Sequence, residues 1–300
     1  MKTRKTLNRG AAAAASAVLL GSLALTAPAT ATTTETTATA AACSINVGSV
    51  TAAGDIANTA VTAGSPITVK RSKGPHMFAP GVAKVATTWT TTVGVAGDTT
   101  TYGSVILNAT LYDGAYGYRS TGEPFTELTS RGGGYNGYKA IEQSFYWGKT
   151  NRGAEYRLRG DGVLYRYVPD TRTMSRWPGY SAVKTMALIS ETATYDTFLA
   201  NTYGGALYTI RIPVTGQPVV KKVRTRTWQG FEYLVAEKCG VQSTLLVGVD
   251  KDAKAAYLYA VGHANGATTL IQGLGKIPGE FADPVHYLHT AEGNAPLFGE

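Results

Sequence analysis

A unit of aromatic and glycine residues, repeated three times in the second half of the chain, constrains the fold more than any other sequence feature. Each copy opens with an aromatic residue, a glycine two residues later and a second aromatic, and it closes with a Leu-Tyr pair. The openings are residues 135–138, 177–180 and 228–231, and the Leu-Tyr pairs are residues 164–165, 207–208 and 258–259. The leading aromatic precedes the leucine by 29, 30 and 30 residues, whereas successive copies start 42 and 51 residues apart. Constant spacing within a unit and variable spacing between units predict strands of fixed length joined by free loops, and a period of about 40 to 50 residues is typical of a β-propeller.

The composition agrees with an all-β chain of this kind. The 300 residues include 35 glycines and 12 prolines, which suit many short strands joined by turns, and hydrophobic residues make up 44%, enough for a core. No segment after the N-terminus carries the apolar period of a helix over more than a turn or two. Residues 78–82 read as a degenerate earlier opening and residues 275–281 as a later one. We therefore expect an all-β fold, a five-bladed β-propeller of four-stranded antiparallel blades, across residues 43–300.

The two ends of a propeller must meet, because a last blade that is not joined to the first leaves open strand edges. Too few residues follow position 281 to build four strands. We expect the propeller to be closed by an N-terminal strand segment, residues 43–75, which would complete the last blade. The alternative is that residues 43–75 form a small separate β module.

The first 31 residues have the pattern of a signal peptide. Four basic residues and no acidic one precede an apolar run from Ala11 to Leu25, and an A-x-A sequence follows at residues 29–31. Residues 32–42, rich in Thr and Ala, are expected to be a low-complexity linker. Removal of the four basic residues lowers the formal net charge from +8 to +4, which gives no reason to expect a nucleic-acid partner. Since no other segment reaches 18 apolar residues, we expect a secreted, extracellular protein without a membrane span.

The chain contains two cysteines, Cys43 and Cys239. In an oxidising compartment an isolated even pair is expected to form a disulfide. Such a bond would attach the N-terminal segment to the third repeat. The alternative is a lipid anchor on Cys43, but this requires a cysteine directly behind the apolar run, and about seventeen residues intervene.

Units that open with Trp-x-Gly-Phe and close with Gly-x-Leu-Tyr resemble the repeats of tachylectin-like proteins. The matching residues lie within positions 134–261 and are Tyr135, Gly137, Tyr138, Ile141, Gly162, Leu164 and Tyr165, then Trp177, Gly179, Tyr180, Val183, Gly205, Leu207 and Tyr208, then Trp228, Gly230, Phe231, Leu234, Leu258 and Tyr259. The resemblance implies a secreted five-bladed propeller that binds N-acetylated amino sugars.

Aromatic residues beside polar ones in the three units give the candidate sugar-binding residues, which are Tyr135, Asn136, Arg176, Trp177, Trp228 and Gln229. Aromatic rings stack on the C–H faces of pyranose rings, and neighbouring polar groups fix the orientation of a bound ligand. We expect a non-catalytic, lectin-like protein that binds amino-sugar-containing glycans of cell walls or chitin. We also expect Trp177 and Trp228 at equivalent positions in successive blades, and the alternative for both is a packing role between blades.

Two other functions remain open, an extracellular hydrolase or lyase that works from the propeller mouth and an interaction scaffold without a small ligand. Carboxyl candidates for the hydrolase are Glu142, Glu155, Glu191, Asp196, Glu232 and Glu237, and the sequence singles out no pair of them. No serine lies in a G-x-S-x-G motif.

Neither the histidines nor the acidic turns have the spacing of a metal site, so we expect no metal and no cofactor. His286 and His289 would lie on opposite faces of a strand, and Asp250-Lys251-Asp252 lacks the other ligands of a calcium loop. The basic run at residues 221–226 is interpreted as a charged outer strand that discourages edge pairing, or as a contact for an anionic polymer. The oligomeric state is left open.

Overall fold

The computed structural model describes residues 42–149, 151–291 and 297–300, and in this part of the chain the secondary structure is β-strand apart from one 3-10 turn at Gly266–Thr268. The all-β expectation is confirmed. The signal peptide and nearly all of the linker predicted for residues 1–42 lie outside the described residues. None of the described segments is a helix with the length and apolar character needed to cross a membrane.

Within the described residues, twelve strands form three antiparallel sheets of four strands, each made of four consecutive strands. The first sheet contains β9 (Tyr138–Tyr146), β10 (Arg152–Arg159), β11 (Leu164–Val168) and β12 (Thr173–Trp177). The second contains β13 (Val183–Glu191), β14 (Tyr195–Thr202), β15 (Leu207–Pro213) and β16 (Val219–Arg224). The third contains β17 (Tyr233–Cys239), β18 (Ser243–Asp250), β19 (Ala255–Val261) and β20 (Ile271–Lys276). Four-stranded antiparallel sheets were expected, and these three confirm that expectation.

The remaining described strands form a single nine-stranded sheet, which differs from the expected pattern. They are β1 (Ser44–Val50), β2 (Asp55–Thr62), β3 (Thr68–His76), β4 (Ala83–Ala86), β5 (Trp89–Val93), β6 (Thr99–Leu107), β7 (Thr110–Tyr118), β8 (Pro124–Gly133) and β21 (Val285–Ala291). The order is β3-β2-β1-β21-β5-β6-β7-β8, with β4 also paired to β6. The sheet is continuous because β21 pairs antiparallel with β1 on one side and, over three residue pairs, parallel with β5 on the other. Strands from the two ends of the described chain therefore share one sheet.

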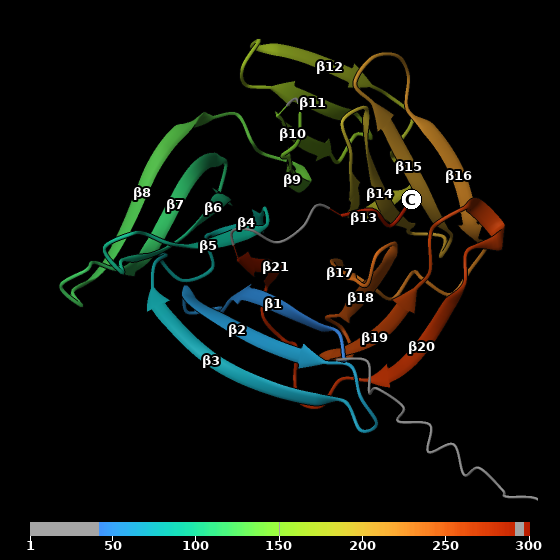
Figure 1. Ribbon diagram of the computed structural model, residues 1–300. Coiled ribbons are helices and arrows are strands. Elements are labelled where there is room, and N and C mark those ends of the chain that lie inside the picture. The colour runs from blue at the N-terminus through green and yellow to red at the C-terminus, as the bar shows by residue number, and fades with distance from the viewer. Residues whose placement is uncertain (1–41, 150, 292–296) are drawn as a thin grey trace, which may run out of the picture. The chain divides into compact units, whose positions relative to one another are not determined.

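The sheets are arranged around a common centre (Figure 1). β4, β9, β13, β17 and β21 lie nearest that centre, and β3, β8, β12, β16 and β20 lie outermost. Each inner strand contacts the next in the order β4, β9, β13, β17, β21, and β21 contacts β4. This arrangement is consistent with a β-propeller.

One backbone hydrogen bond recurs between each sheet region and the connection that leaves it. The N–H groups of five aromatic residues in the described chain donate to carbonyl oxygens in hairpin turns, in the pairs Phe78–Gly54 (3.1 Å), Tyr135–Ala109 (2.9 Å), Tyr180–Gly162 (2.9 Å), Trp228–Gly205 (3.0 Å) and Phe281–Lys254 (3.1 Å). In four of these turns the accepting residue has a positive φ, which favours glycine and explains Gly54, Gly162 and Gly205 at three of them. The openings expected at residues 78–82 and 275–281 thus make the same contact as the three clear repeats.

The same hydrogen bonds correct the alignment of the repeats. They place Trp228 in register with Tyr180 and not with Trp177. The next hydrogen bonds agree, since the N–H of Phe231 donates to Trp228 O and that of Val183 to Tyr180 O. The prediction that Trp177 and Trp228 are equivalent is therefore wrong by three residues. Trp177 is the last residue of β12, whereas Trp228 lies in the connection between β16 and β17.

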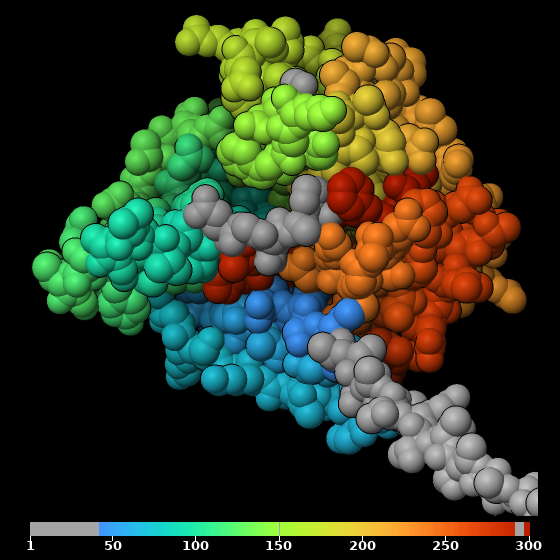
Figure 2. Space-filling model, viewed as in Figure 1, coloured from blue at the N-terminus to red at the C-terminus, as the bar shows by residue number. Residues whose placement is uncertain are grey.

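Hydrophobic side chains pack between neighbouring sheets. One cluster joins Tyr156 and Leu164 of the first sheet to Phe198 and Ile210 of the second, and another joins Leu199 and Leu207 to Leu246 and other residues of the third. The predicted disulfide is confirmed, with Cys43 bonded to Cys239 and their Cα atoms 5.5 Å apart. It attaches the start of β1 to the end of β17, so that the N-terminal strands and β17–β20 lie side by side (blue and orange in Figure 2).

Candidate ligand site in the central cavity

Trp177 and Trp228, the two tryptophans among the candidate sugar-binding residues, lie in the cores between sheets. Their side chains are 7% and 5% exposed. Trp228 packs on Phe231 and Tyr259, with ring centroids 5.6 and 5.0 Å away. An aromatic platform for a sugar needs an open ring face, so the packing of both indoles favours the structural alternative considered for them.

The polar candidates lie outside these cores. Asn136, Arg176 and Gln229 are exposed, and the backbone carbonyl of Gln229 accepts a hydrogen bond from Lys184 Nζ at 2.6 Å. Tyr135 is half-buried, with the Arg157 guanidinium 5.0 Å from its ring centroid. Each polar candidate is adjacent in the chain to an aromatic residue that is buried or half-buried, and a sugar site at these junctions stays a prediction.

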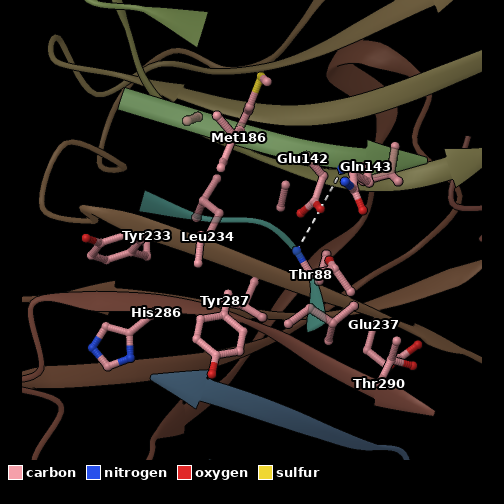
Figure 3. A pocket seen from close by; sticks show the side chains of 18 of the residues that line it. Thr88, Glu142, Gln143, Met186, Tyr233, Leu234, Glu237, His286, Tyr287 and Thr290 are labelled. Atoms are coloured by element: carbon pink, nitrogen blue, oxygen red, sulfur yellow. Dashed lines mark hydrogen bonds between the residues drawn. The ribbon is translucent and has the colours of Figure 1, made fainter. Parts of the chain in front are cut away.

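A different part of the molecule offers an open cavity of about 590 Å³ at the centre of the sheets (Figure 3). It is lined by the inner strands β4, β9, β13, β17 and β21 together with Thr88, Thr90 and Tyr102. This volume lies in the range of known small-ligand sites, which are about 300–1,000 Å³.

The inner strands run in the same direction along the cavity, as contacts between residues at or near their starts show. Lys139, near the start of β9, donates to the carbonyl of Ser181 just before β13. Lys184, near the start of β13, forms an ion pair with Glu232 just before β17 at 2.5 Å. Tyr233, the first residue of β17, packs on His286 of β21 with ring centroids 5.4 Å apart.

Carboxyl groups lie further along the same strands. Glu142 Oε1 accepts hydrogen bonds from the N–H groups of Thr88 (2.8 Å) and Gln143 (2.9 Å). Glu191 Oε1 accepts one from the N–H of Phe145 at 3.1 Å, and Glu237 Oε1 accepts one from the N–H of Lys238 at 2.9 Å. In Figure 3, Glu142, Gln143, Glu237 and Thr290 lie toward one end of the cavity, while Tyr233 and His286 lie toward the other.

A β-bulge turns Glu191 toward this site. Leu188 pairs with Phe198 and Ser190 with Thr197, which leaves Ile189 as the extra residue in β13. Leu188 and Glu191 therefore share the face that packs against β9. Without the bulge, alternation along the strand would place Ser190 on that face instead.

Burial perturbs the pKa values of all three carboxyl groups. Burial raises the pKa of Glu142 from 4.5 to about 7, against the opposing effect of the N–H groups of Thr88 and Gln143. Burial raises the pKa of Glu191 to about 8, and the nearby charges of Asp196 and Glu142 act in the same direction. The pKa of Glu237 is also raised by burial, while the N–H of Lys238 and the hydroxyl of Thr290 oppose the shift. Near neutral pH, Glu142 and Glu191 can therefore exist in either protonation state.

Two exposed aromatic side chains lie on and just after β9, the strand that carries Glu142. Phe145 and Trp147 line the cavity and their side chains are 49% and 69% exposed. Gln143 precedes Phe145 by two residues, and its Nε2 donates to Ser104 Oγ at 3.1 Å. The sequence analysis did not select these residues. Their signal was the alternation of Gln143, Phe145 and Trp147, which puts a polar and two aromatic side chains on one side of an extended segment.

The other end of the cavity contains a buried, neutral histidine. His286 is 5% exposed, and neither ring nitrogen has a hydrogen-bond partner of normal geometry among the described side chains and backbone. Burial lowers its pKa to about 3, Lys251 lowers it further and a backbone contact with Asp283 acts in the opposite direction. The ring is therefore uncharged at any physiological pH.

The described residues contain no group of three or more His, Cys, Asp or Glu side chains that could hold a metal ion. His289 lies on the other face of β21 from His286, where its Nε2 is 2.8 Å from Thr91 Oγ1.

The basic run falls on β16, the outermost strand of its sheet, where Lys221 and Lys222 are exposed and the strand ends at Arg224. Arg226 thus lies beyond the end of the outer strand that was expected for residues 221–226.

Comparison of the chain with models of known protein families finds no match, and comparison with curated proteins finds none either. The resemblance to tachylectin-like proteins therefore stays a prediction from the repeat pattern.

Proposed function

We propose that this chain is a secreted five-bladed β-propeller that binds amino-sugar-containing glycans at the mouth of its central cavity. In this proposal β21 is the inner strand of the blade completed by β1, β2 and β3, so that strands from both ends close the ring. The cyclic contacts of the inner strands, the pairing of β1 with β21 and the five recurrent aromatic hydrogen bonds among the described residues support the blade count. The disulfide supports secretion, since such bonds persist in oxidising compartments.

The observation that carries the binding proposal is the combination of exposed aromatic side chains and hydrogen-bonding groups that line the cavity along the second half of β9 and just beyond it. Phe145 and Trp147 offer the apolar surface, while Gln143, Glu142 and Glu191 offer donors and acceptors. Ligand sites combine apolar lining with a few convergent polar groups in this way. The binding site is thus proposed at the end of β9 and not at the junctions that contain Trp177 and Trp228.

The test is the binding of residues 32–300 to a panel of oligosaccharides, measured by calorimetry. We expect at least one amino-sugar oligomer to bind and Trp147→Ala to weaken it about tenfold or more, as for a central aromatic contact. Tyr118→Ala is the matched control, because Tyr118 is 58% exposed on β7 and does not line the cavity.

Three outcomes contradict the proposal in different ways. Absence of binding to every sugar by the folded protein refutes the glycan function. Unchanged affinity in both variants refutes the cavity mouth as the site. Loss of affinity in a folded Trp228→Ala variant, without loss in Trp147→Ala, places the site at the blade junction.

A second candidate function, glycan hydrolysis, is favoured by the carboxyl groups in the cavity. Groups with perturbed pKa values in a cleft are candidates for acid–base catalysis, and Glu142 and Glu191 have pKa values near neutrality. Cleavage of the oligosaccharides that bind would support hydrolysis if both Glu142→Gln and Glu191→Gln abolish it. Intact oligosaccharides after prolonged incubation would exclude it for those sugars.

A further inference from the structure

The acidic side chains of this protein fall into two groups that differ in their partners. Buried carboxylates outside the cavity are paired with cations, as uncompensated buried charges are costly. Asp196 binds Arg152 at 2.6 Å, Glu155 binds Arg131 at 2.7 Å and Glu300 binds Arg211 at 3.1 Å.

The carboxyl groups that line the cavity lack such partners. Among the described residues, Glu142, Glu191 and Glu237 accept hydrogen bonds from backbone N–H groups but form no ion pair. Arg152 is the cation whose charge lowers the pKa of Glu191, but its guanidinium already donates to both carboxylate oxygens of Asp196. Lys139, which also lines the cavity, is directed to backbone carbonyls before and at the start of β13.

We propose that the missing cation belongs to the ligand, and that the cavity prefers sugars with a free, protonated amine to their N-acetylated forms. The ammonium group would lie between the carboxylates of Glu142 and Glu191. The rings of Phe145 and Trp147 would cover the carbon skeleton and attract the cation through their faces. This inference rests on the proposed glycan function and specifies the class of sugar.

The far end of the cavity supplies an independent indication of a ligand. His286 is buried and lines the cavity, yet neither ring nitrogen has a hydrogen-bond partner of normal geometry among the described residues. Buried polar groups are nearly always satisfied, and an exception suggests a partner that the protein itself does not provide. A neutral imidazole can accept from one sugar hydroxyl and donate to another.

The experiment compares glucosamine oligomers with N-acetylglucosamine oligomers of the same length, with calorimetry at pH 7 and low salt. We expect the free-amine oligomer to bind at least tenfold more tightly, and added salt to weaken it more than the N-acetylated one. We also expect binding of an N-trimethylated oligomer, whose charge is permanent, to release protons, because Glu142 and Glu191 must ionise. Titrations in buffers of different ionisation enthalpy measure that release. The other titratable groups that line the cavity are Lys139, Tyr102, Tyr233, Glu237, His286 and Tyr287.

The double variant Glu142→Gln/Glu191→Gln keeps the shape of both side chains and removes their charge. We expect it to reduce the preference for the free amine to less than threefold and to abolish proton release, whereas Glu123→Gln, at an exposed site on the β7–β8 hairpin, should do neither. Equal or tighter binding of the N-acetylated oligomer would overturn the inference and leave the proposed glycan function standing. Failure of both oligomers to bind would refute the proposed function itself. An amine preference that survives the double variant would overturn the role given to the two carboxylates.

Discussion

Replacement of Glu191 by glutamine should stabilise the protein at high pH and have little effect at low pH. Burial raises the pKa of this carboxyl from 4.5 to about 8, so the folded state binds its proton more tightly than the unfolded state. Between these two values the folded protein retains a proton that the unfolded chain loses, and its stability falls as the pH rises through this window. Glutamine has nearly the same shape and never carries the charge.

The size of the effect follows from the two pKa values. Each tenfold difference in proton affinity corresponds to about 1.4 kcal/mol, so complete ionisation of Glu191 costs up to about 5 kcal/mol of folding free energy. The side chain faces a cavity open to water, which screens the charge, and we expect about 2 kcal/mol at pH 9. For a domain of this size that is a rise in Tm of about 4–8 °C.

The assay is thermal or urea unfolding of the wild type, Glu191→Gln and the exposed control Glu123→Gln at pH 5 and pH 9. At pH 5, just above the unfolded-state pKa of 4.5, only the beginning of this window has been crossed, and the three proteins should unfold within about 1 kcal/mol of one another. At pH 9 Glu191→Gln should be the most stable. A Glu191→Gln variant that is destabilised at pH 9, or one whose gain is the same at both pH values, would show that the carboxylate is not the penalised species.

Two further predictions test how the ends of the chain are held. Cys43→Ser or Cys239→Ser should lower the free energy of unfolding by about 2–5 kcal/mol, because the disulfide joins residues with a sequence separation of 196. Denaturation of the wild type and the variants without reductant measures this difference, and a loss below about 1 kcal/mol would contradict the prediction. Gly48→Ala should lower the free energy of unfolding by about 1–3 kcal/mol, because a Cβ at Gly48 on β1 would lie 2.2 Å from the Tyr287 ring on β21. Gly133→Ala is the control, since the nearest neighbour of its Cβ would be 3.9 Å away. Equal stability of the two variants would argue against the close pairing of β1 with β21.

The turns and strand starts could be predicted from the sequence because they depend on residues close together in the chain. The glycines at 162 and 205 mark hairpin turns with positive φ, and the Leu-Tyr pairs that follow them begin β11 and β15. The disulfide could be predicted because the chain contains only two cysteines, Cys43 and Cys239, and they allow only one intramolecular pairing.

The candidate site could not be predicted in the same way. Glu142 and Glu191 were among six carboxyl candidates, and no periodicity separates them from Glu155 or Asp196, which are bound by arginines. The orientation of Glu191 depends on the bulge at Ile189, which no turn residue announces. Trp177 and Trp228 were the conspicuous aromatics, but aromatic residues serve cores as well as ligands, and exposure alone distinguishes Trp147 from them.

The strand content, the repeating turns and the all-β class could thus be predicted from spacing and residue type within a few tens of residues, and the disulfide from the presence of a single pair of cysteines. The position of β21 between β1 and β5, and the approach of carboxyl groups from three separate strands to one cavity, could be seen only in the folded protein. Strand neighbours and cavity linings are set by packing between segments far apart in the chain. The free energy of that packing depends on shape and on buried charge, and it leaves no local pattern in the sequence.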